Sequence, residues 1–179
     1  MRKLGIAGAA VVVFAATQVT LAEDAMVTIK LGGGVFYNRG GGAQKTHPGG
    51  HLSLDLRLPD KNILLSPYGD VYKKSSTTTM LGGVHAFAKP PMRSDVVSLY
   101  FGAGAGVARQ RYKTTVIDST TLRASEVFVT RNLKQIDLVG GVELRISRTI
   151  SLFVEPRYVR GDSTLNGLAA HAGLSFEMK

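Results

Sequence analysis

The sequence predicts an all-β fold, an eight-stranded antiparallel up-and-down transmembrane β-barrel. Three observations lead to this fold class. Apolar and polar residues alternate with a period of two in eight successive windows, which is the spacing of half-buried strands. The connections between these windows alternate between longer and shorter, which is the layout of a barrel that crosses a membrane. Glycine is abundant, with 21 in 179 residues, and the mean hydropathy is only +0.08, so a bundle of apolar helices is excluded.

The amino-terminal segment is expected to be removed before the chain folds. Arg2 and Lys3 form a positive head, an apolar run follows over residues 4–16, and the segment ends in a small-x-small cleavage pattern. The apolar run is shorter than the ~20 residues that a spanning helix needs, which disfavours the alternative of a membrane anchor. We therefore expect a secretory signal peptide over residues 1–22 and one barrel domain over residues 23–179.

The first four strands are expected between residues 27 and 88. In the window His51–Leu58 leucine occupies every second position, so one strand face is apolar and the other polar. The windows Val27–Tyr37, Ile63–Val71 and Met80–Ala88 keep the same alternation less regularly. Each of these windows is typical of a strand with one apolar face.

The second four strands are expected between residues 97 and 178. The window Val97–Val107 has glycine at every second position from 102 to 106, and each glycine would cost a helix about 1 kcal/mol relative to alanine. A strand is therefore favoured there. The windows Gln135–Ile146, Ile150–Tyr158 and Leu168–Met178 alternate as regularly as the second strand.

The connections between the expected strands indicate how the barrel is oriented. The even-numbered connections are short and rich in turn residues, and the odd-numbered connections are longer. An up-and-down meander with this pattern places all long loops at one end, as in an outer-membrane barrel. A soluble barrel around an apolar ligand cavity is the alternative. The short connections are 59–62, 89–95 and 147–149, and the long ones are 38–50, 73–79, 108–133 and 159–167.

The polar faces of the expected strands carry arginines and carboxylates in comparable number. Charges in a confined interior must be paired and hydrogen-bonded, because an isolated buried ion is strongly unfavourable. The interior of an eight-stranded barrel is only wide enough to be filled by side chains. These residues therefore predict a charge network that plugs the lumen, in preference to an open pore or a catalytic site. The residues of this expected lumen network are Asp55, Arg57, Asp137, Glu143, Arg145, Glu155, Arg157 and Glu177.

The last strands resemble those of a known family. The final segment HAGLSFEM matches the pattern polar-x-Gly-x-x-aromatic-x-hydrophobic, and residues 152–158 are similar to a penultimate strand. With its signal peptide and eight alternating windows, the chain resembles the small outer-membrane β-barrel proteins of the opacity-protein, OmpX and OmpA membrane-domain kind. The resemblance implies an outer-membrane location and recognition of the last strand by the barrel-assembly machinery. The residues that match this assembly signal are His171, Gly173, Phe176 and Met178.

Aromatic side chains form girdles at the membrane interfaces of such barrels. This chain has no tryptophan, so tyrosine and phenylalanine would have to supply the girdles. The candidates are Tyr37, Tyr68, Tyr72, Tyr100, Tyr158 and Phe176.

No catalytic residue, cofactor or metal ligand is expected. His51 and Ser53 form a His-x-Ser pair that resembles the pair of barrel enzymes that modify lipid A, but both fall on the polar strand face and no asparagine follows the serine. The four histidines lack the spacing of metal ligands, and the chain has no cysteine. A lipid A modifying enzyme and a narrow porin-like channel are therefore alternatives to a non-enzymatic role.

The expected third long loop is rich in basic residues and is the best candidate for partner contact. A basic collar attracts lipopolysaccharide phosphates through long-range electrostatics, while export separates the chain from nucleic acid. We expect a monomer with a structural or surface-interaction role that contacts outer-membrane lipid, lipopolysaccharide and, through its long loops, a surface ligand. The triplet Arg160-Gly161-Asp162 is interpreted as a turn in preference to an adhesive motif. The basic candidates are Arg109, Arg111, Lys113, Arg123 and Arg131.

Overall fold

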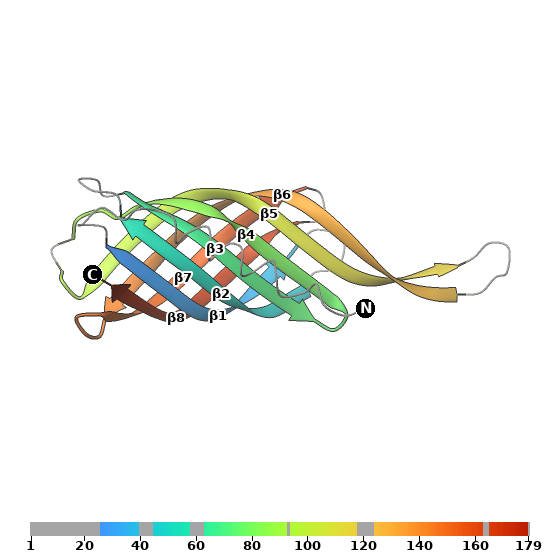
Figure 1. The fold of residues 1–179 in the computed structure, drawn as a ribbon, viewed down its shortest axis with the longest axis horizontal. Coiled ribbons are helices and arrows are strands. Elements are labelled where there is room, and N and C mark those ends of the chain that lie inside the picture. Colours follow the sequence, from blue (N-terminus) through green and yellow to red (C-terminus); the bar gives the residue numbers. More distant parts are fainter. Residues whose placement is uncertain are drawn as a thin grey trace.

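The computed structural model forms a closed antiparallel β-barrel of eight strands (Figure 1). It describes residues 26–39, 45–57, 63–92, 94–117, 124–162 and 165–178, and within them no helix has the length and apolar character of a membrane span. Each strand pairs with the next along the chain, and β1 pairs with β8 to close the barrel. The predicted fold class is therefore confirmed. The strands are β1 (Val27–Asn38), β2 (Lys45–Arg57), β3 (Ile63–Lys74), β4 (Thr77–Ala88), β5 (Val97–Ile117), β6 (Ala124–Arg145), β7 (Ile150–Gly161) and β8 (Asn166–Met178).

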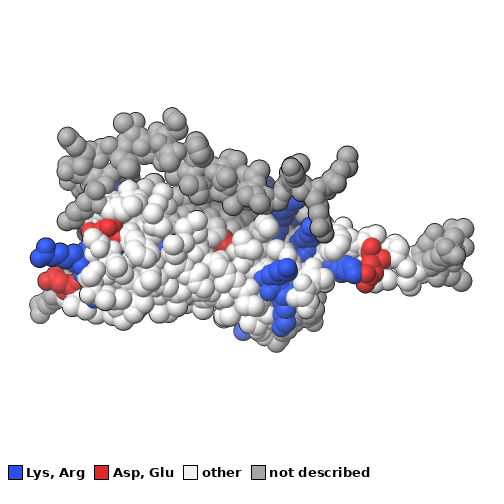
Figure 2. Space-filling model, turned by 60° about the horizontal axis from the view of Figure 1, so that its bottom comes forward, with Lys and Arg blue, Asp and Glu red and all other residues white. Residues whose placement is uncertain are grey.

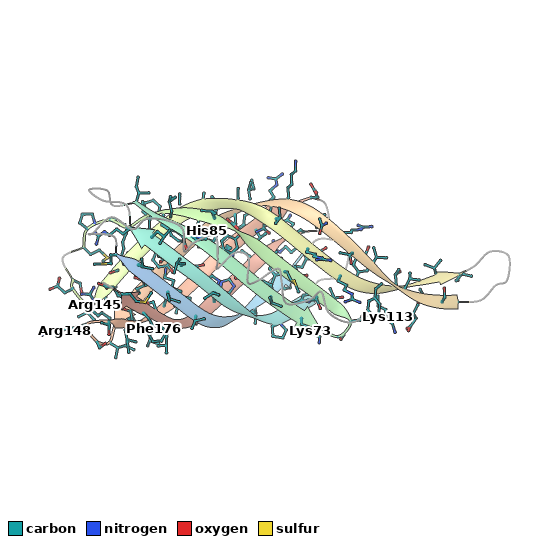
Figure 3. All side chains as sticks on the ribbon, viewed as in Figure 1. Lys73, His85, Lys113, Arg145, Arg148 and Phe176 are labelled. Carbon is teal, nitrogen blue, oxygen red and sulfur yellow. The ribbon has the colours of Figure 1, made fainter. Side chains whose placement is uncertain are left out.

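The alternation places the large apolar side chains on the outside of the barrel. Phe101 and Leu138, for example, are 60% and 62% exposed. The intervening positions point inward and hold buried polar or charged side chains such as Asp137 and His85, the latter labelled in Figure 3. This arrangement is the inverse of a soluble barrel with an apolar cavity.

The two longest strands extend beyond the barrel as a hairpin. β5 and β6 have 21 and 22 residues, whereas β1 has 12. Past Arg111 on β5 and before Gln135 on β6, these strands pair only with each other (Figure 1). The expected loop over 108–133 is therefore mostly strand, because its threonines and valines continue the alternation and favour extended backbone.

The other expected long loops are also shorter than predicted. β2 begins upstream of its predicted window, and the link between β3 and β4 contains only Ser75 and Ser76. Ser75 has a φ of 52°, which lets the chain reverse within two residues. The prediction of a long loop over 73–79 is wrong, and the asymmetry between the barrel ends lies in the β5–β6 hairpin. Outside the described residues lie the expected signal peptide 1–22, Leu58 with the connection 59–62, and Arg123.

Basic residues follow the outward apolar positions at the hairpin end of the barrel. On β5 the outward apolar side chains end at Val107 and Arg109 comes next; on β7 they end at Tyr158 and Arg160 comes next. Figure 2 shows basic side chains gathered where the hairpin leaves the barrel. We call the residues that end the outward rows of five strands the outer basic ring: Arg39, Lys73, Arg109, Lys134 and Arg160, all exposed. In Figure 3, Lys73 and Lys113 lie toward this end, and Arg145, Arg148 and Phe176 lie at the opposite end.

Three of the tyrosines expected in an interfacial girdle lie inside the barrel instead. Tyr68, Tyr72 and Tyr100 are buried, and their hydroxyls bond interior polar groups. Alternation alone placed them there, since each occupies an inward position of its strand. Tyr37 and Tyr158 do face outward, next to the outer basic ring.

Candidate functional site

The barrel interior is the candidate functional site, because it holds seven buried charged side chains among the described residues. The period of two aims these side chains inward, and barrel closure brings together strands that are distant in the sequence. Acids outnumber bases in this set. The acids are Asp55, Asp70, Asp137, Glu143 and Glu155, and the bases are Lys30 and Arg157.

Lys30 on β1 joins two of the carboxylates. Its ammonium lies 2.7 Å from Asp55 and 3.0 Å from Glu143. Lys89, which directly follows β4, also binds Glu143, at 2.7 Å. The Lys30 ammonium stands 4.0 Å from the centre of the Tyr100 ring, so a cation–π contact completes its surroundings.

Arg157 on β7 is the second buried cation and also bridges two carboxylates. Its guanidinium donates to Asp70 at 2.7 Å and to Glu155 at 3.0 Å. The ring of Tyr68 covers the guanidinium at 4.3 Å. The Tyr100 hydroxyl donates to Glu155 at 3.0 Å and so connects the Arg157 group to the lysine group.

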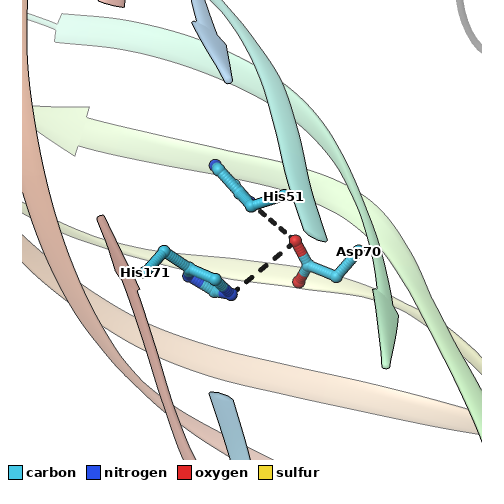
Figure 4. Close-up of side chains that lie close together, drawn as sticks. All are labelled: His51, Asp70 and His171. Carbon is cyan, nitrogen blue, oxygen red and sulfur yellow. Dashed lines mark hydrogen bonds and ion pairs between the residues drawn. The ribbon is translucent and has the colours of Figure 1, made fainter. Parts of the chain in front are cut away.

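Asp70 is also the meeting point of two histidines (Figure 4). His51 Nδ1 lies 2.6 Å from Asp70 Oδ1, and His171 Nε2 lies 3.9 Å from the same oxygen. The two rings stack with their centroids 4.5 Å apart. Ser53 Oγ lies 3.2 Å from His51 Nε2, and the Tyr72 hydroxyl hydrogen-bonds His171 Nε2. The site therefore contains a buried His–Asp–His group that β2, β3 and β8 bring together.

A third histidine contacts a carboxylate beside Gly104. His85 Nε2 lies 3.1 Å from Asp137 Oδ1, and the Tyr68 hydroxyl donates to Asp137 Oδ2 at 2.5 Å. Gly104 of β5 is paired with both His85 and Asp137. A Cβ at position 104 would lie 2.2 Å from the His85 ring and 2.3 Å from the Asp137 carboxylate. The contact between these two side chains thus requires glycine between them.

The structure brings together only part of the expected lumen network. Arg57 is exposed as the last residue of β2, and the half-exposed Arg145 lies 3.7 Å from Glu177 at the same barrel end. These three follow the alternation but lie outside the enclosed part of the barrel. Sequence reasoning missed Lys30 and Asp70, although both occupy polar positions of their predicted strands. The expected residues that the structure does bring together are Asp55, Asp137, Glu143, Glu155 and Arg157.

The basic candidates for partner contact lie on the β5–β6 hairpin. Arg109, Arg111 and Lys113 alternate along the outward face of β5, and Arg131 lies on the opposite face of β6. Lys113 forms an exposed ion pair with Glu126. The base of the hairpin thus presents several basic groups to its surroundings.

The four residues of the expected assembly signal divide between the two faces of β8. His171 and Gly173 occupy inward positions, and Phe176 and Met178 occupy outward positions. One β8 face therefore contributes to the interior site and the other to the outer surface.

The Arg-Gly-Asp triplet lies where β7 ends. The backbone N–H of Gly161 donates to the Leu165 carbonyl at 2.7 Å, and the N–H of Leu165 donates to the Asp162 carbonyl at 2.8 Å. These bonds form the turn that the sequence predicts there.

Comparison with models of protein families found no match, and comparison with curated proteins found no relative. Solved structures do match. Neisserial surface protein A (NspA) has a TM-score of 0.64 at 14% identity, covering 86% of this chain and 96% of its own. Ail, the attachment invasion locus protein of Yersinia pestis, has a TM-score of 0.61 at 13% identity, covering 86% and 98%. The N-terminal barrel domain of Pseudomonas aeruginosa OprF has a TM-score of 0.55 at 13% identity, covering 87% and 98%. The chain therefore has the fold of the small eight-stranded outer-membrane β-barrels.

Proposed function

We propose that the protein is an integral outer-membrane barrel whose outer basic ring binds the phosphate groups of lipopolysaccharide. Its role is one of surface interaction and envelope structure, with neither a catalytic step nor an open channel. The observation that carries the proposal is the ring itself, because five outward apolar rows end on an arginine or lysine at the same end of the barrel. Basic side chains at the edge of an apolar belt are placed to bind anionic lipid headgroups.

The band of outward-facing apolar side chains around the barrel, here called the apolar belt, supports the membrane location. On β5 the outward apolar positions run from Leu99 to Val107, which matches the ~9–11 residues with which a tilted strand crosses a membrane. Tyr37 and Tyr158 lie two residues before Arg39 and Arg160, where an aromatic girdle meets the headgroups. Apolar belt, aromatic residues and cations thus follow one another in the order that a membrane boundary requires.

The buried network supports a closed lumen. Phe36, Tyr68, Tyr72 and Arg157 are among the largest side chains that the barrel encloses completely. A solute that crossed the lumen would have to displace these side chains and separate the Arg157 ion pairs. Breaking a buried ion pair leaves charges unpaired in a low dielectric, which is strongly unfavourable.

The interior also argues for a role without catalysis. Ser53, His51 and Asp70 are hydrogen-bonded in the order of a hydrolase triad. A nucleophile must meet its substrate, however, and the Ser53 hydroxyl is buried inside the barrel. Arg157 in addition occupies the second oxygen of Asp70, so the group is built as an enclosed hydrogen-bond network.

One matched structure supports the anion-binding part of the proposal. Ail of Yersinia pestis was also solved in complex with the heparin analogue sucrose octasulfate, and that structure has a TM-score of 0.57 at 12% identity. Its ligand is a sugar with several negative charges. A barrel of this fold can therefore bind an anionic saccharide. In this chain we assign the binding of anionic groups to the outer basic ring.

The test compares lipopolysaccharide binding by the native barrel and by a ring variant, both folded in detergent micelles. The ring variant carries Arg39→Gln, Lys73→Gln, Arg109→Gln, Lys134→Gln and Arg160→Gln. We expect at least about a tenfold loss of affinity, because each cation near an anionic surface contributes about 1 kcal/mol. The loss should largely disappear when the lipopolysaccharide is dephosphorylated.

The matched control removes charge at the other end of the barrel through Arg57→Gln, Arg145→Gln and Arg148→Gln. This control should bind lipopolysaccharide as the native barrel does. Equal binding by the native barrel and the ring variant, or an equal loss in the control, would overturn the proposal.

A further inference from the structure

The buried group of His51, Asp70 and His171 has the composition of a metal site. Each residue offers one donor atom, and the three donors lie within 4.8 Å of one another. The distances to Asp70 Oδ1 are 2.6 Å from His51 Nδ1 and 3.9 Å from His171 Nε2 (Figure 4). Two imidazoles and one carboxylate are a donor set of zinc and of other divalent first-row transition ions.

The backbone makes room for this convergence. His51 on β2 and His171 on β8 flank β1, where they are paired with Gly32 and Gly34. A Cβ at Gly34 would lie 2.5 Å from the His171 ring. The absence of a side chain at Gly34 therefore leaves the space in which the His171 ring stacks on His51 across β1.

Two of the atoms that do not face the centre of the group are hydrogen-bonded by other side chains. Ser53 Oγ lies 3.2 Å from His51 Nε2, and Arg157 holds Asp70 Oδ2 at 2.7 Å. Glu155 lies 4.0 Å from His171 Nδ1. Metal-binding histidines commonly use one ring nitrogen for the ion and the other for a hydrogen-bond partner, often a carboxylate. The group thus has a second layer of partners of the kind that orients metal ligands.

The buried interior has an excess of negative charge, which a further cation would neutralise. The described interior contains five buried carboxylates but only two buried fixed cations, Lys30 and Arg157, with Lys89 at the barrel end. Buried negative charge without compensation is unfavourable, and a divalent ion next to Asp70 would offset it.

We propose that His51 Nδ1, Asp70 Oδ1 and His171 Nε2 bind a divalent transition ion of the zinc class inside the barrel. A tetrahedral zinc ion with bonds of about 2.0 Å sets its donors about 3.3 Å apart. The 2.6 Å and 3.9 Å distances to Asp70 Oδ1 bracket that value, so small side-chain movements complete the site. The Tyr72 hydroxyl, which contacts His171 Nε2, is the neighbour positioned to supply an oxygen as the fourth ligand.

The ion would cross-link strands from the two ends of the chain. It connects β2 and β3 of the amino-terminal half to β8, the strand that closes the barrel against β1. Metal binding that requires the folded arrangement stabilises that arrangement. This role is independent of the lipopolysaccharide proposal, because the outer basic ring contributes none of the ligands.

The experiment folds the full chain from urea into detergent with Zn²⁺, removes loosely bound ion by gel filtration and measures zinc per chain by mass spectrometry. The variants His51→Gln and His171→Gln are compared with His85→Gln, which removes a buried histidine outside the group. We expect about one ion per chain in the native protein and in His85→Gln. Each of the other two variants should lose at least about tenfold in occupancy at limiting Zn²⁺.

A second measurement keeps the test independent of whether the variants fold. The native chain is folded with Co²⁺, and its visible absorption and paramagnetically shifted imidazole resonances are recorded. Large contact shifts of the His51 and His171 ring protons, with only a smaller through-space shift at His85, support the site. A native protein that retains neither Zn²⁺ nor Co²⁺, or a loss of zinc in His85→Gln equal to that in His51→Gln, would overturn the proposal.

Discussion

Glycines determine where large polar side chains can meet inside this barrel. Gly104 separates His85 from Asp137, and Gly34 lies beside the ring of His171. At both positions a methyl group would occupy the space of a functional side chain. These glycines therefore serve close approach across a strand, in addition to any effect on strand curvature.

Gly104→Ala tests this role. The added methyl group would lie within 2.3 Å of both His85 and Asp137, so the contact must open. We expect a loss of about 1–3 kcal/mol in the free energy of unfolding, which is typical of overpacking. The measurement is a urea titration followed by circular dichroism. Gly69→Ala is the control, because a Cβ there meets no atom within 4 Å, and an equal loss in both variants would contradict the explanation.

Arg157→Gln tests the buried ion pairs. The substitution removes the cation that binds both Asp70 and Glu155, and the barrel encloses both carboxylates. We expect a destabilisation of about 3–5 kcal/mol, seen as a lower urea midpoint or as loss of the heat-modifiable form on a gel. Arg145→Gln removes an exposed partner 3.7 Å from Glu177, and we expect a change below about 1 kcal/mol. Similar losses of stability in the two variants would show that the buried ion pairs stabilise the barrel no more than the exposed pair does.

Period two alone was sufficient to predict which charged residues point inward, but not which of them meet. Asp137 and Glu155 were predicted because their strands alternate regularly. Arg57 and Arg145 share that alternation, yet they lie at strand ends where the barrel no longer encloses them. The contact between His51 and His171 depends on barrel closure through β1, and no spacing along the chain reveals it.

At the scale of elements, the β5–β6 hairpin differs from the rest of the barrel. The described residues of its outer part have no neighbouring strand on either side, since pairing with β4 ends at Arg111 and pairing with β7 begins at Gln135. The outward side chains change there from apolar to basic, as Val107 is followed by Arg109 and Arg111. The sequence predicted a long connection at this place and left open whether residues 116–129 extend the hairpin, because basic residues replace the apolar face by which strands were identified.

Shortening the hairpin tests whether its outer part contributes to barrel stability. Tyr112 and Val129 are paired across the hairpin, so residues 113–128 can be replaced by an Asn-Gly turn without a change of register. We expect the free energy of unfolding to change by less than about 1 kcal/mol, because the described residues that are removed form strand pairs only with each other, beyond the closed barrel. The check is the urea midpoint of the shortened chain. A chain that no longer gives a folded, heat-modifiable band would contradict the separation of hairpin and barrel.

At the scale of the whole molecule, the barrel carries its apolar residues outside and its charges inside. A soluble barrel with the reverse arrangement would show the same alternation along every strand, so the alternation does not distinguish the two. The loop lengths favoured the membrane arrangement, but the connection between β3 and β4 is in fact only two residues long. What distinguishes the two arrangements is enclosure: Lys30, Asp55 and Arg157 are buried, while Leu138 and Phe101 are exposed.

Val154→Arg tests the proposed membrane location. Val154 lies in the middle of the outward row of β7 and is 55% exposed. In a lipid bilayer an arginine at this depth should destabilise the barrel by about 2–4 kcal/mol, because the charge must leave water. On a water-exposed surface the same change would stay within about 0.5 kcal/mol. Ile117→Arg at the end of β5 is the matched control, since Ile117 is 65% exposed on the hairpin beyond the belt. Urea unfolding in lipid vesicles compares the two variants, and equal stability would place the outward face of β7 in water.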